Sequence, residues 1–109
     1  MRYRVKLVAI FNTVANRNAA GTWLQNKLAE RPRFDGDGSA FIDELGRPGI
    51  VAMIRYDGAA DADWLEGALK TKAQEAGVIA ARVSVHECKH DEPPDQWRDC
   101  RTIFREWTR

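Results

Sequence analysis

The chain has 109 residues, of which 44% are hydrophobic and 30% charged, and this mixture is typical of a single soluble globular domain. Its 17 basic and 16 acidic residues leave a formal net charge of +1, so no overall field attracts it to nucleic acid or to an anionic membrane. The apolar run from Leu7 to Phe11 is too short for a membrane span or a signal peptide, and two cysteines without such a signal indicate reduced thiols. We therefore expect a cytoplasmic protein with no membrane partner.

The first part of the chain predicts a strand followed by a helix. Residues 4–12 are rich in β-branched and aromatic side chains after a charged start, as strands are. Thr13, Asn16 and Asn18, in the polar stretch that follows, are all plausible helix N-caps, and an apolar stripe at helical spacing runs from Ala20 to Leu28. Proline cannot continue a helix, so the segment ends before Pro32.

The second part of the chain predicts the same pair of elements after a β-hairpin. The segments "SAFIDEL" and "GIVAMIRY" lie on either side of the turn-forming tetrapeptide "GRPG". Residues 39–56 therefore predict two antiparallel strands joined by a tight turn. A helical stripe then runs from Trp64 to Ala73, before Gly77, where a left-handed helix stop is common. The alternating segment at residues 78–90 predicts a fourth strand.

An internal repeat supports one domain built from two halves. "VAIF" followed by "WLQNKL" recurs as "VAMI" followed by "WLEGAL". The element order βαββαβ and right-handed crossovers predict a ferredoxin-like α+β sandwich over residues 1–92. Its four-stranded antiparallel sheet would have the order 4-1-3-2, with two helices on one face. Residues 93–109 predict a C-terminal amphipathic helix that packs on the sheet or on a partner subunit.

Strand alternation divides the predicted sheet into a core face and an open face. Val5, Leu7 and Phe11 would lie beneath the helices, so the residues between them would lie on the other side. The candidate interaction surface consists of Val8, Ile10, Val51 and Met53 on the two central strands and of Trp97, Cys100, Phe104 and Trp107 on the tail. The tail itself, a second copy of the chain, or a different protein or ligand could cover this apolar surface.

These features favour a small interaction or regulatory domain that self-associates, rather than an enzyme. The alternative is a nucleic-acid-associated protein, because Arg4, Lys6, Arg55 and Arg82 would form a basic margin on the open face. The middle of that face is aliphatic, so base stacking of the kind found on RNA-binding sheets is not predicted.

A metal site is a further hypothesis. His86, Cys88 and His90 lie at period two, so on a strand they would project from one side, and Cys100 could supply a fourth zinc ligand. The spacing matches no common zinc module, so a solvated strand end with one packed thiol is the competing interpretation. No other cofactor is expected.

A small dimeric enzyme is the least favoured hypothesis. Ser84 lies two residues from His86, and Arg82, Tyr3 or Tyr56 could assist in a substrate pocket. No third group is placed to orient the histidine, and nothing in the sequence selects a reaction class.

Overall fold

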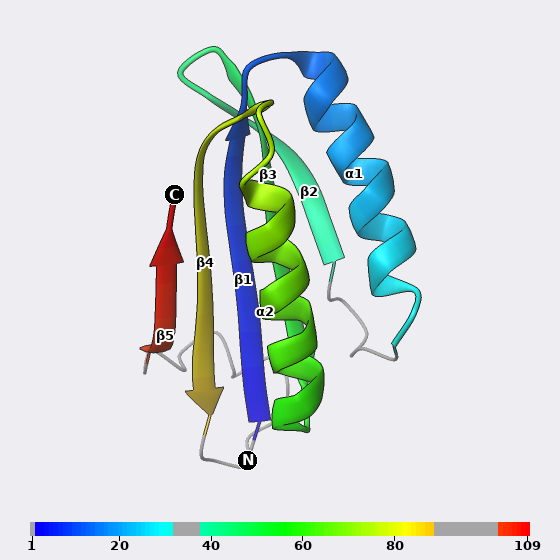
Figure 1. The fold of residues 1–109 in the computed structure, drawn as a ribbon, viewed down its shortest axis with the longest axis vertical. Helices are drawn as coiled ribbons and strands as arrows, with labels where there is room; N and C mark the ends of the chain where they lie inside the picture. Colours follow the sequence, from blue (N-terminus) through cyan, green and yellow to red (C-terminus); the bar gives the residue numbers. More distant parts are fainter. Residues whose placement is uncertain (1, 32–37, 89–102) are drawn as a thin grey trace.

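Seven elements build the protein in the computed structural model, which describes residues 2–31, 38–88 and 103–109. The strands and helices are β1 (Arg2–Phe11), α1 (Val14–Leu28), β2 (Gly38–Glu44), β3 (Arg47–Tyr56), α2 (Ala59–Ala73), β4 (Val78–Cys88) and β5 (Ile103–Thr108). The strands form one antiparallel sheet in the order β2-β3-β1-β4-β5. Both helices lie on the same face of this sheet (Figure 1).

The predicted α+β class, the antiparallel sheet and the two helices on one face are confirmed. The predicted strand count is wrong, because the sheet has five strands instead of four. The strand order therefore also differs from 4-1-3-2, since β5 lies beyond β4 and forms the edge of the sheet. The structure supports the coarser description, an α+β protein with an open five-stranded sheet.

The predicted C-terminal helix is wrong over residues 103–108, which form strand β5. The segment "IFREWT" contains β-branched and aromatic residues, which suit a strand as well as a helical stripe. Without β5, β4 would be an edge strand with a row of unpaired backbone donors and acceptors. Pairing with β4 satisfies these groups, and this long-range gain outweighs the local helical pattern. Phe104 belongs to β5, whereas Trp97 and Cys100 lie outside the described residues.

Arginine side chains fasten β5 to α2 near both ends of the strand. The guanidinium of Arg105 donates hydrogen bonds to Asp63 and, over 3.2 Å from Nε, to the carboxylate of Glu66. Arg109 donates to the carbonyl oxygen of Ala73 over 3.2 Å, at the C-terminal end of α2. A cation is favourable there because the last carbonyls of a helix carry partial negative charge. β5 thus covers the edge of β4, and Arg109, the residue after β5, caps the C-terminal end of α2.

The hairpin between β2 and β3 turns at Leu45 and Gly46, not at the predicted "GRPG". Both residues have positive φ, 53° and 80°, as a two-residue type I′ turn requires. Such a turn matches the twist of the flanking strands, so the chain adopts it although leucine disfavours this backbone conformation. Leu45 is 96% exposed, and no packing offsets its strain.

We expect Leu45→Asn to raise the free energy of unfolding by about 1 kcal/mol, because asparagine tolerates the left-handed region. Leu45→Ala is the matched control, since it removes the exposed apolar side chain but keeps the backbone strain. Chemical denaturation of the three proteins measures the difference. Equal stability of the asparagine and alanine variants would contradict the expectation.

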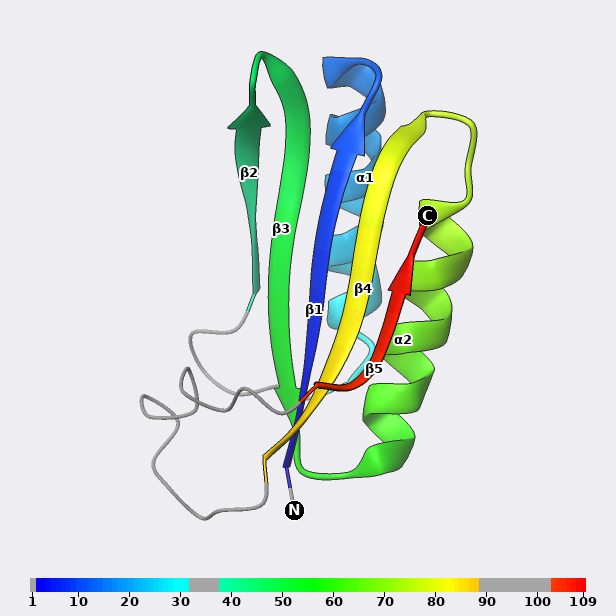
Figure 2. The same ribbon diagram turned by 90° about the vertical axis from the view of Figure 1, so that its left-hand side faces the viewer.

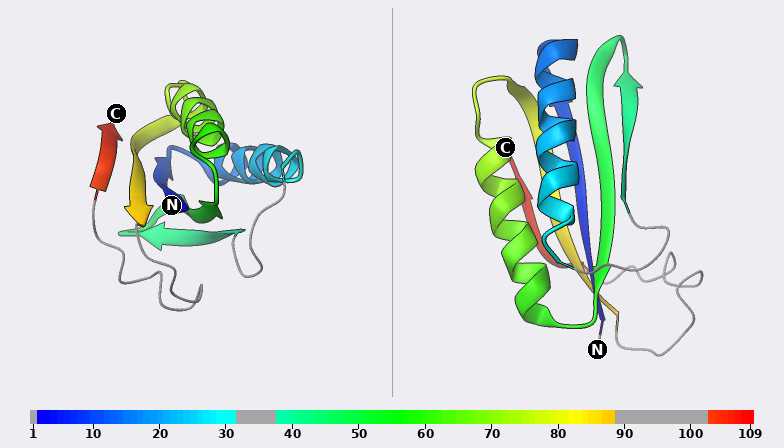
Figure 3. Two further views of the ribbon diagram at one scale, coloured as in Figure 1. Left: turned by 90° about the horizontal axis from the view of Figure 1, so that it is seen from below. Right: turned by 90° about the vertical axis from the view of Figure 1, so that its right-hand side faces the viewer.

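The core lies between the sheet and the helices, where Leu28, Leu65 and Val83 are fully buried. α1 lies over β3 and β2, and α2 lies over β1 and β4 (Figure 3). The two repeated tryptophans lie at the seam between the helices. The ammonium group of Lys72 lies 5.3 Å from the centroid of the Trp23 ring, and the guanidinium carbon of Arg31 lies 4.3 Å from that of Trp64. Each tryptophan therefore joins its own helix to a cation from the other repeat.

Candidate functional site

The open face of the sheet brings the predicted apolar residues of β1 and β3 together. Val8 lies directly opposite Val51 in the antiparallel register, and Met53 lies opposite Lys6. Val8, Ile10, Val51 and Met53 are all half-buried, as expected for side chains surrounded by neighbours on a sheet surface. Figure 2 looks onto this face, and the described helices lie behind it.

Strand β2 extends the apolar surface by two residues that sequence reasoning missed. Ala40 lies opposite Val51, and Ile42 lies opposite Gly49. A Cβ atom at Gly49 would lie 2.9 Å from both Ile10 Cδ1 and Ile42 Cγ1, so the two isoleucines approach each other over this glycine. The alternation of "SAFIDE" is the sequence signal that could have revealed these two residues. We call Val8, Ile10, Ala40, Ile42, Val51 and Met53 the open-face patch.

Trp107 does not belong to this surface, contrary to the prediction. Its Cα lies opposite that of Val83, a fully buried residue on the helix side, and its half-buried side chain packs against the core. Two polar residues of β5 lie on the open face, Glu106 opposite Ser84 and Thr108 opposite Arg82. The open-face patch therefore lies over β1, β2 and β3.

The predicted basic margin is divided. Arg4 lies opposite Arg55 on one side and His86 on the other, and we call these three residues the basic row. Lys6 follows Arg4 on the same face. Arg82 lies apart from the row, with its exposed guanidinium 3.8 Å from the carboxylate of Glu106.

Burial lowers the pKa of Arg4, and the charge of Arg55 lowers it further. Arg4 is only 7% exposed, so little of its side chain can reach a phosphate group from solvent. The part of the basic margin that is accessible consists mainly of Lys6 and Arg55, both half-buried.

A serine and a histidine lie in contact beside the basic row. Ser84 Oγ and His86 Nε2 are 3.2 Å apart, and the two residues are 4% and 8% exposed. The Nδ1 atom of His86 has no hydrogen-bond partner among the described residues. Burial lowers the pKa of His86, as do the charges of Arg4 and Lys6, while Glu106 opposes the shift. These effects favour the neutral form of the imidazole.

This pair does not assemble the active site that the enzyme hypothesis requires. Tyr3 and Tyr56 lie opposite each other on the helix side of the sheet, and Tyr56 is 2% exposed. Ser84 and His86 lie on the open face, so the candidate catalytic residues are divided between two faces. The buried serine is also inaccessible to a substrate that approaches from solvent.

The shifted pKa of His86 predicts a pH dependence of stability. Its pKa in the folded protein is lower than the unfolded value of 6.5, so the unfolded chain binds a proton first as the pH falls. The free energy of unfolding should therefore decrease as the pH falls below about 6.5, and it should be insensitive to this group above that value. Denaturation between pH 7.5 and pH 5.5 measures the slope. His86→Gln should abolish it, and an unchanged slope in this variant would contradict the assignment.

The metal hypothesis falls partly outside the described residues. His86 and Cys88 both belong to β4, whereas His90 and Cys100 lie in residues 89–102. Within the described ranges, no three or more histidine, cysteine, aspartate or glutamate residues form a group that could hold a metal ion. The proposed zinc site remains a prediction.

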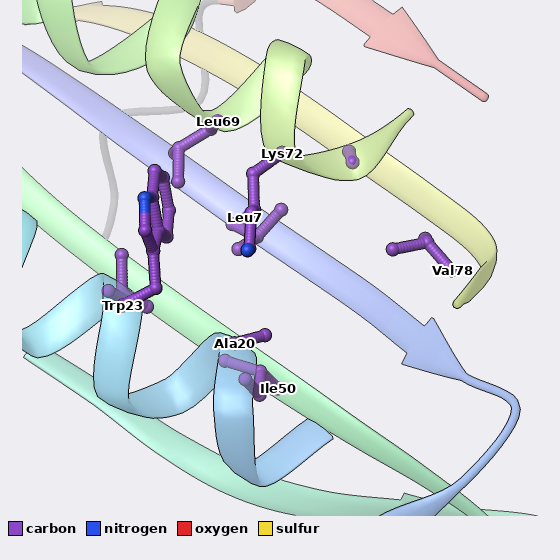
Figure 4. A pocket seen from close by; sticks show the side chains of 9 residues that line it. Leu7, Ala20, Trp23, Ile50, Leu69, Lys72 and Val78 are labelled. Atoms are coloured by element: carbon purple, nitrogen blue, oxygen red, sulfur yellow. The ribbon is translucent and has the colours of Figure 1, made fainter. Parts of the chain in front are cut away.

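Two hollows lie elsewhere in the fold, and neither is lined by His86 or Ser84. A cavity of about 20 Å³ lies between the helices and the sheet, with Trp23, Lys72 and Leu7 among its lining residues (Figure 4). Its apolar walls and small size exclude a substrate. A groove of about 610 Å³ runs between α1 and β2 and is lined by polar side chains, among them Asn18 and Gln25.

No family model, no curated protein and no solved structure matches this chain. In the part of the chain that the structure describes, neither helix is long and apolar enough to cross a membrane. The class of the protein therefore follows from its fold and surface alone: a small α+β protein with an open antiparallel sheet whose face away from the two described helices is apolar in the middle.

Proposed function

We propose that this protein is an interaction domain that forms a symmetric dimer through its open sheet face. The observation that carries the proposal is the contiguous open-face patch, on a face that neither described helix covers. Apolar patches of this kind usually mark interaction sites. Removing a few hundred Å² from water stabilises an interface by several kcal/mol, at roughly 25 cal/mol per Å².

The arrangement of charge on the face is compatible with a second copy as the partner. The open-face patch includes Ile10 near the end of β1, whereas the basic row includes Arg4 near its beginning. A twofold axis across the strands, through the patch, would place the two basic rows at opposite ends of the interface. Like charges would then be separated while the two apolar surfaces face each other, about 10 Å apart as in packed sheets.

Val51→Glu tests this proposal. A carboxylate at the centre of the interface would lose its hydration without gaining a partner, so we expect the dimer to dissociate. The matched control is Val14→Glu, because Val14 is 54% exposed in the first turn of α1, on the helical side of the protein.

Sedimentation equilibrium measures the mass, and circular dichroism checks that both variants fold. We expect a dimer for the wild type and for Val14→Glu, and a monomer for Val51→Glu. A monomeric wild type, or a mass that Val51→Glu leaves unchanged, would refute the proposal.

A second candidate function is nucleic-acid binding at the basic row together with Lys6. The supporting observation is that the positive charges lie close together. The charge of Arg55 lowers the pKa of Arg4, and the charges of Arg4 and Lys6 lower the pKa of His86. Because Arg4 and His86 are buried, a bound phosphate would contact mainly Lys6 and Arg55. We expect a single-stranded oligonucleotide to bind with an affinity that falls steeply with salt and that Lys6→Glu weakens more than Arg82→Glu. Binding insensitive to both salt and Lys6→Glu would argue against this candidate.

We further propose a ferredoxin-like plan for residues 1–92 and a cytoplasmic location. The order βαββαβ of the first six described elements supports the plan, and the ordinary composition is compatible with the location. Zinc at His86, Cys88, His90 and Cys100 remains a proposal from spacing. Elemental analysis of the purified protein tests it, and a protein without stoichiometric metal would end it.

A further inference from the structure

The outer edge of β2 lacks the features that usually protect a sheet edge. β2 is the outermost described strand on its side of the sheet, so half of its backbone donors and acceptors point away from β3. Its sequence, "GSAFIDE", contains neither lysine nor proline, and its two charged residues, Asp43 and Glu44, lie at the end next to the hairpin turn, so its first five residues carry no charged guard. At the other edge, by contrast, β5 carries Arg105 and Glu106 and is fastened to α2. Within residues 2–31, 38–88 and 103–109, no strand pairs with the outer edge of β2, which can therefore accept another strand.

Beside this edge lies an uncharged surface. The groove between α1 and β2 is lined on the helix side by amide and hydroxyl side chains, Asn18, Thr22, Gln25 and Asn26 among them. None of the described residues that line it carries a charge, although 30% of the residues in the chain are charged. Phe41, on the strand side, is 55% exposed. Arg17 lies beside this groove, with its guanidinium carbon 4.3 Å from the centroid of the Phe41 ring, so the uncharged surface is limited to the groove itself. Within that limit, the groove can meet a copy of itself without electrostatic repulsion.

We infer that β2 pairs antiparallel with β2 of a second copy, which makes one continuous sheet from two chains. Phe41 is the middle residue of β2, so the register that pairs the whole strand places Phe41 opposite its own copy. In this register Ala40 faces Ile42, and the acidic residues Asp43 and Glu44 face the uncharged Ser39 and Gly38. An aromatic pair at the centre and no like charges directly opposite each other both favour strand pairing.

The helices must contribute to this contact. A stable interface buries about 1,200–2,000 Å² in total, more than a seven-residue strand supplies alone. A twofold axis perpendicular to the sheet keeps both copies of α1 on the same face, one on each side of the new strand pair. Their uncharged groove-lining residues would then face each other across it.

This edge contact goes beyond the proposed open-face dimer and does not depend on it. The axis of the edge contact is perpendicular to the sheet, whereas that of the open-face contact lies parallel to it. Two perpendicular twofold axes that intersect generate a tetramer with dihedral symmetry. If both contacts form, each can be removed separately, and the remaining mass identifies the contact that is left.

Thr22→Lys is the main test, and Thr71→Lys is its matched control. Both threonines are exposed on helices, and both donate a hydrogen bond to the carbonyl four residues earlier, over 3.2 Å and 3.0 Å. Only Thr22 lines the groove, where a lysine would face the same lysine of the second copy. We expect Thr22→Lys to weaken edge association by at least tenfold, and Thr71→Lys to leave it unchanged. Phe41→Lys is a second variant, which places a charge at the centre of the strand pair.

Sedimentation equilibrium of these variants, alone and combined with Val51→Glu, separates the outcomes. The inference is supported if Thr22→Lys and Phe41→Lys each halve the mass of the wild type, or of Val51→Glu, while Thr71→Lys does not. A dimer that Val51→Glu dissociates but the edge variants leave intact overturns the inference and keeps the open-face proposal. A dimer that only the edge variants dissociate does the reverse, and a monomeric wild type overturns both.

Discussion

Gly49→Val is expected to lower the free energy of unfolding by about 3 kcal/mol, at the upper end of the usual range for overpacking. Gly49 lies on β3 between Ile10 of β1 and Ile42 of β2. A Cβ atom there would lie 2.9 Å from the backbone oxygen of Ala9, as well as from the two isoleucine side chains. The backbone of a central strand cannot move aside without breaking its pairing, and valine would add two further methyl groups at the same point. A loss of this size is a large fraction of the stability of a small domain, about 5–15 kcal/mol.

Gly38→Val is the matched control for this substitution. Gly38 is also a strand residue, on β2, but nothing lies within 4 Å of the Cβ atom that a side chain would add. Because valine favours strands and restricts the unfolded chain, this variant should be neutral or slightly more stable than the wild type. Chemical denaturation at one protein concentration compares the three proteins. If both valine variants lost the same stability, the steric explanation for Gly49 would be wrong.

Arg105→Met is expected to lower the free energy of unfolding by about 2 kcal/mol, less than the 3–5 kcal/mol for breaking a fully buried pair, because Arg105 is partly exposed to solvent. The guanidinium of Arg105 lies 3.0 Å from Glu66 and also donates a hydrogen bond to Asp63, which raises the pKa of Arg105. Glu66 is only 7% exposed, so its charge needs a partner within the protein. Without Arg105, the ion-pair partner left to it among the described residues would be Lys70, at 3.5 Å.

The loss should also loosen β5, since Arg105 connects this strand to α2. Amide hydrogen exchange should therefore accelerate in β5 and along the edge of β4 that it covers. Arg82→Met is the matched control, because Arg82 is exposed and its pair with Glu106, at 3.8 Å, contributes little. Equal effects of the two substitutions, or no change of exchange in β4, would show that Arg105 does not hold the strand.

Local patterns were sufficient for six of the seven elements. The predicted strand over residues 4–12 corresponds to β1 (Arg2–Phe11), and the stripe from Trp64 to Ala73 lies within α2 (Ala59–Ala73). These segments have strong periodicity and bury one side against the core, so the local preference and the tertiary environment agree. The pairing of β1 with β3 places Val8 opposite Val51, so both residues lie on the face that strand alternation predicts.

The sequence-based predictions are wrong where two local patterns compete, or where a neighbouring strand determines the conformation or the burial of a residue. Residues 103–108 combine a helical stripe with β-branched and aromatic residues that suit a strand, and the free edge of β4 selects the strand. Leu45 has no propensity for positive φ, and the twist of the hairpin imposes it. Arg4 belongs to the predicted basic margin, but it is buried between Arg55 and His86, because both neighbouring strands cover it.

By itself, the sequence determined the class of the fold, the two helices, the faces of β1, β3 and β4, and the apolar middle of the open face, because side-chain periodicity acts locally. Only the tertiary structure decided which segment pairs with the edge of β4, where Trp107 packs and which arginines are buried. These outcomes depend on backbone hydrogen bonds and charges between segments far apart in the chain, and any segment with a suitable alternation can satisfy a free strand edge. The residues of the open-face patch therefore follow from the alternation along each strand, whereas the limits of the patch follow from the order of the strands.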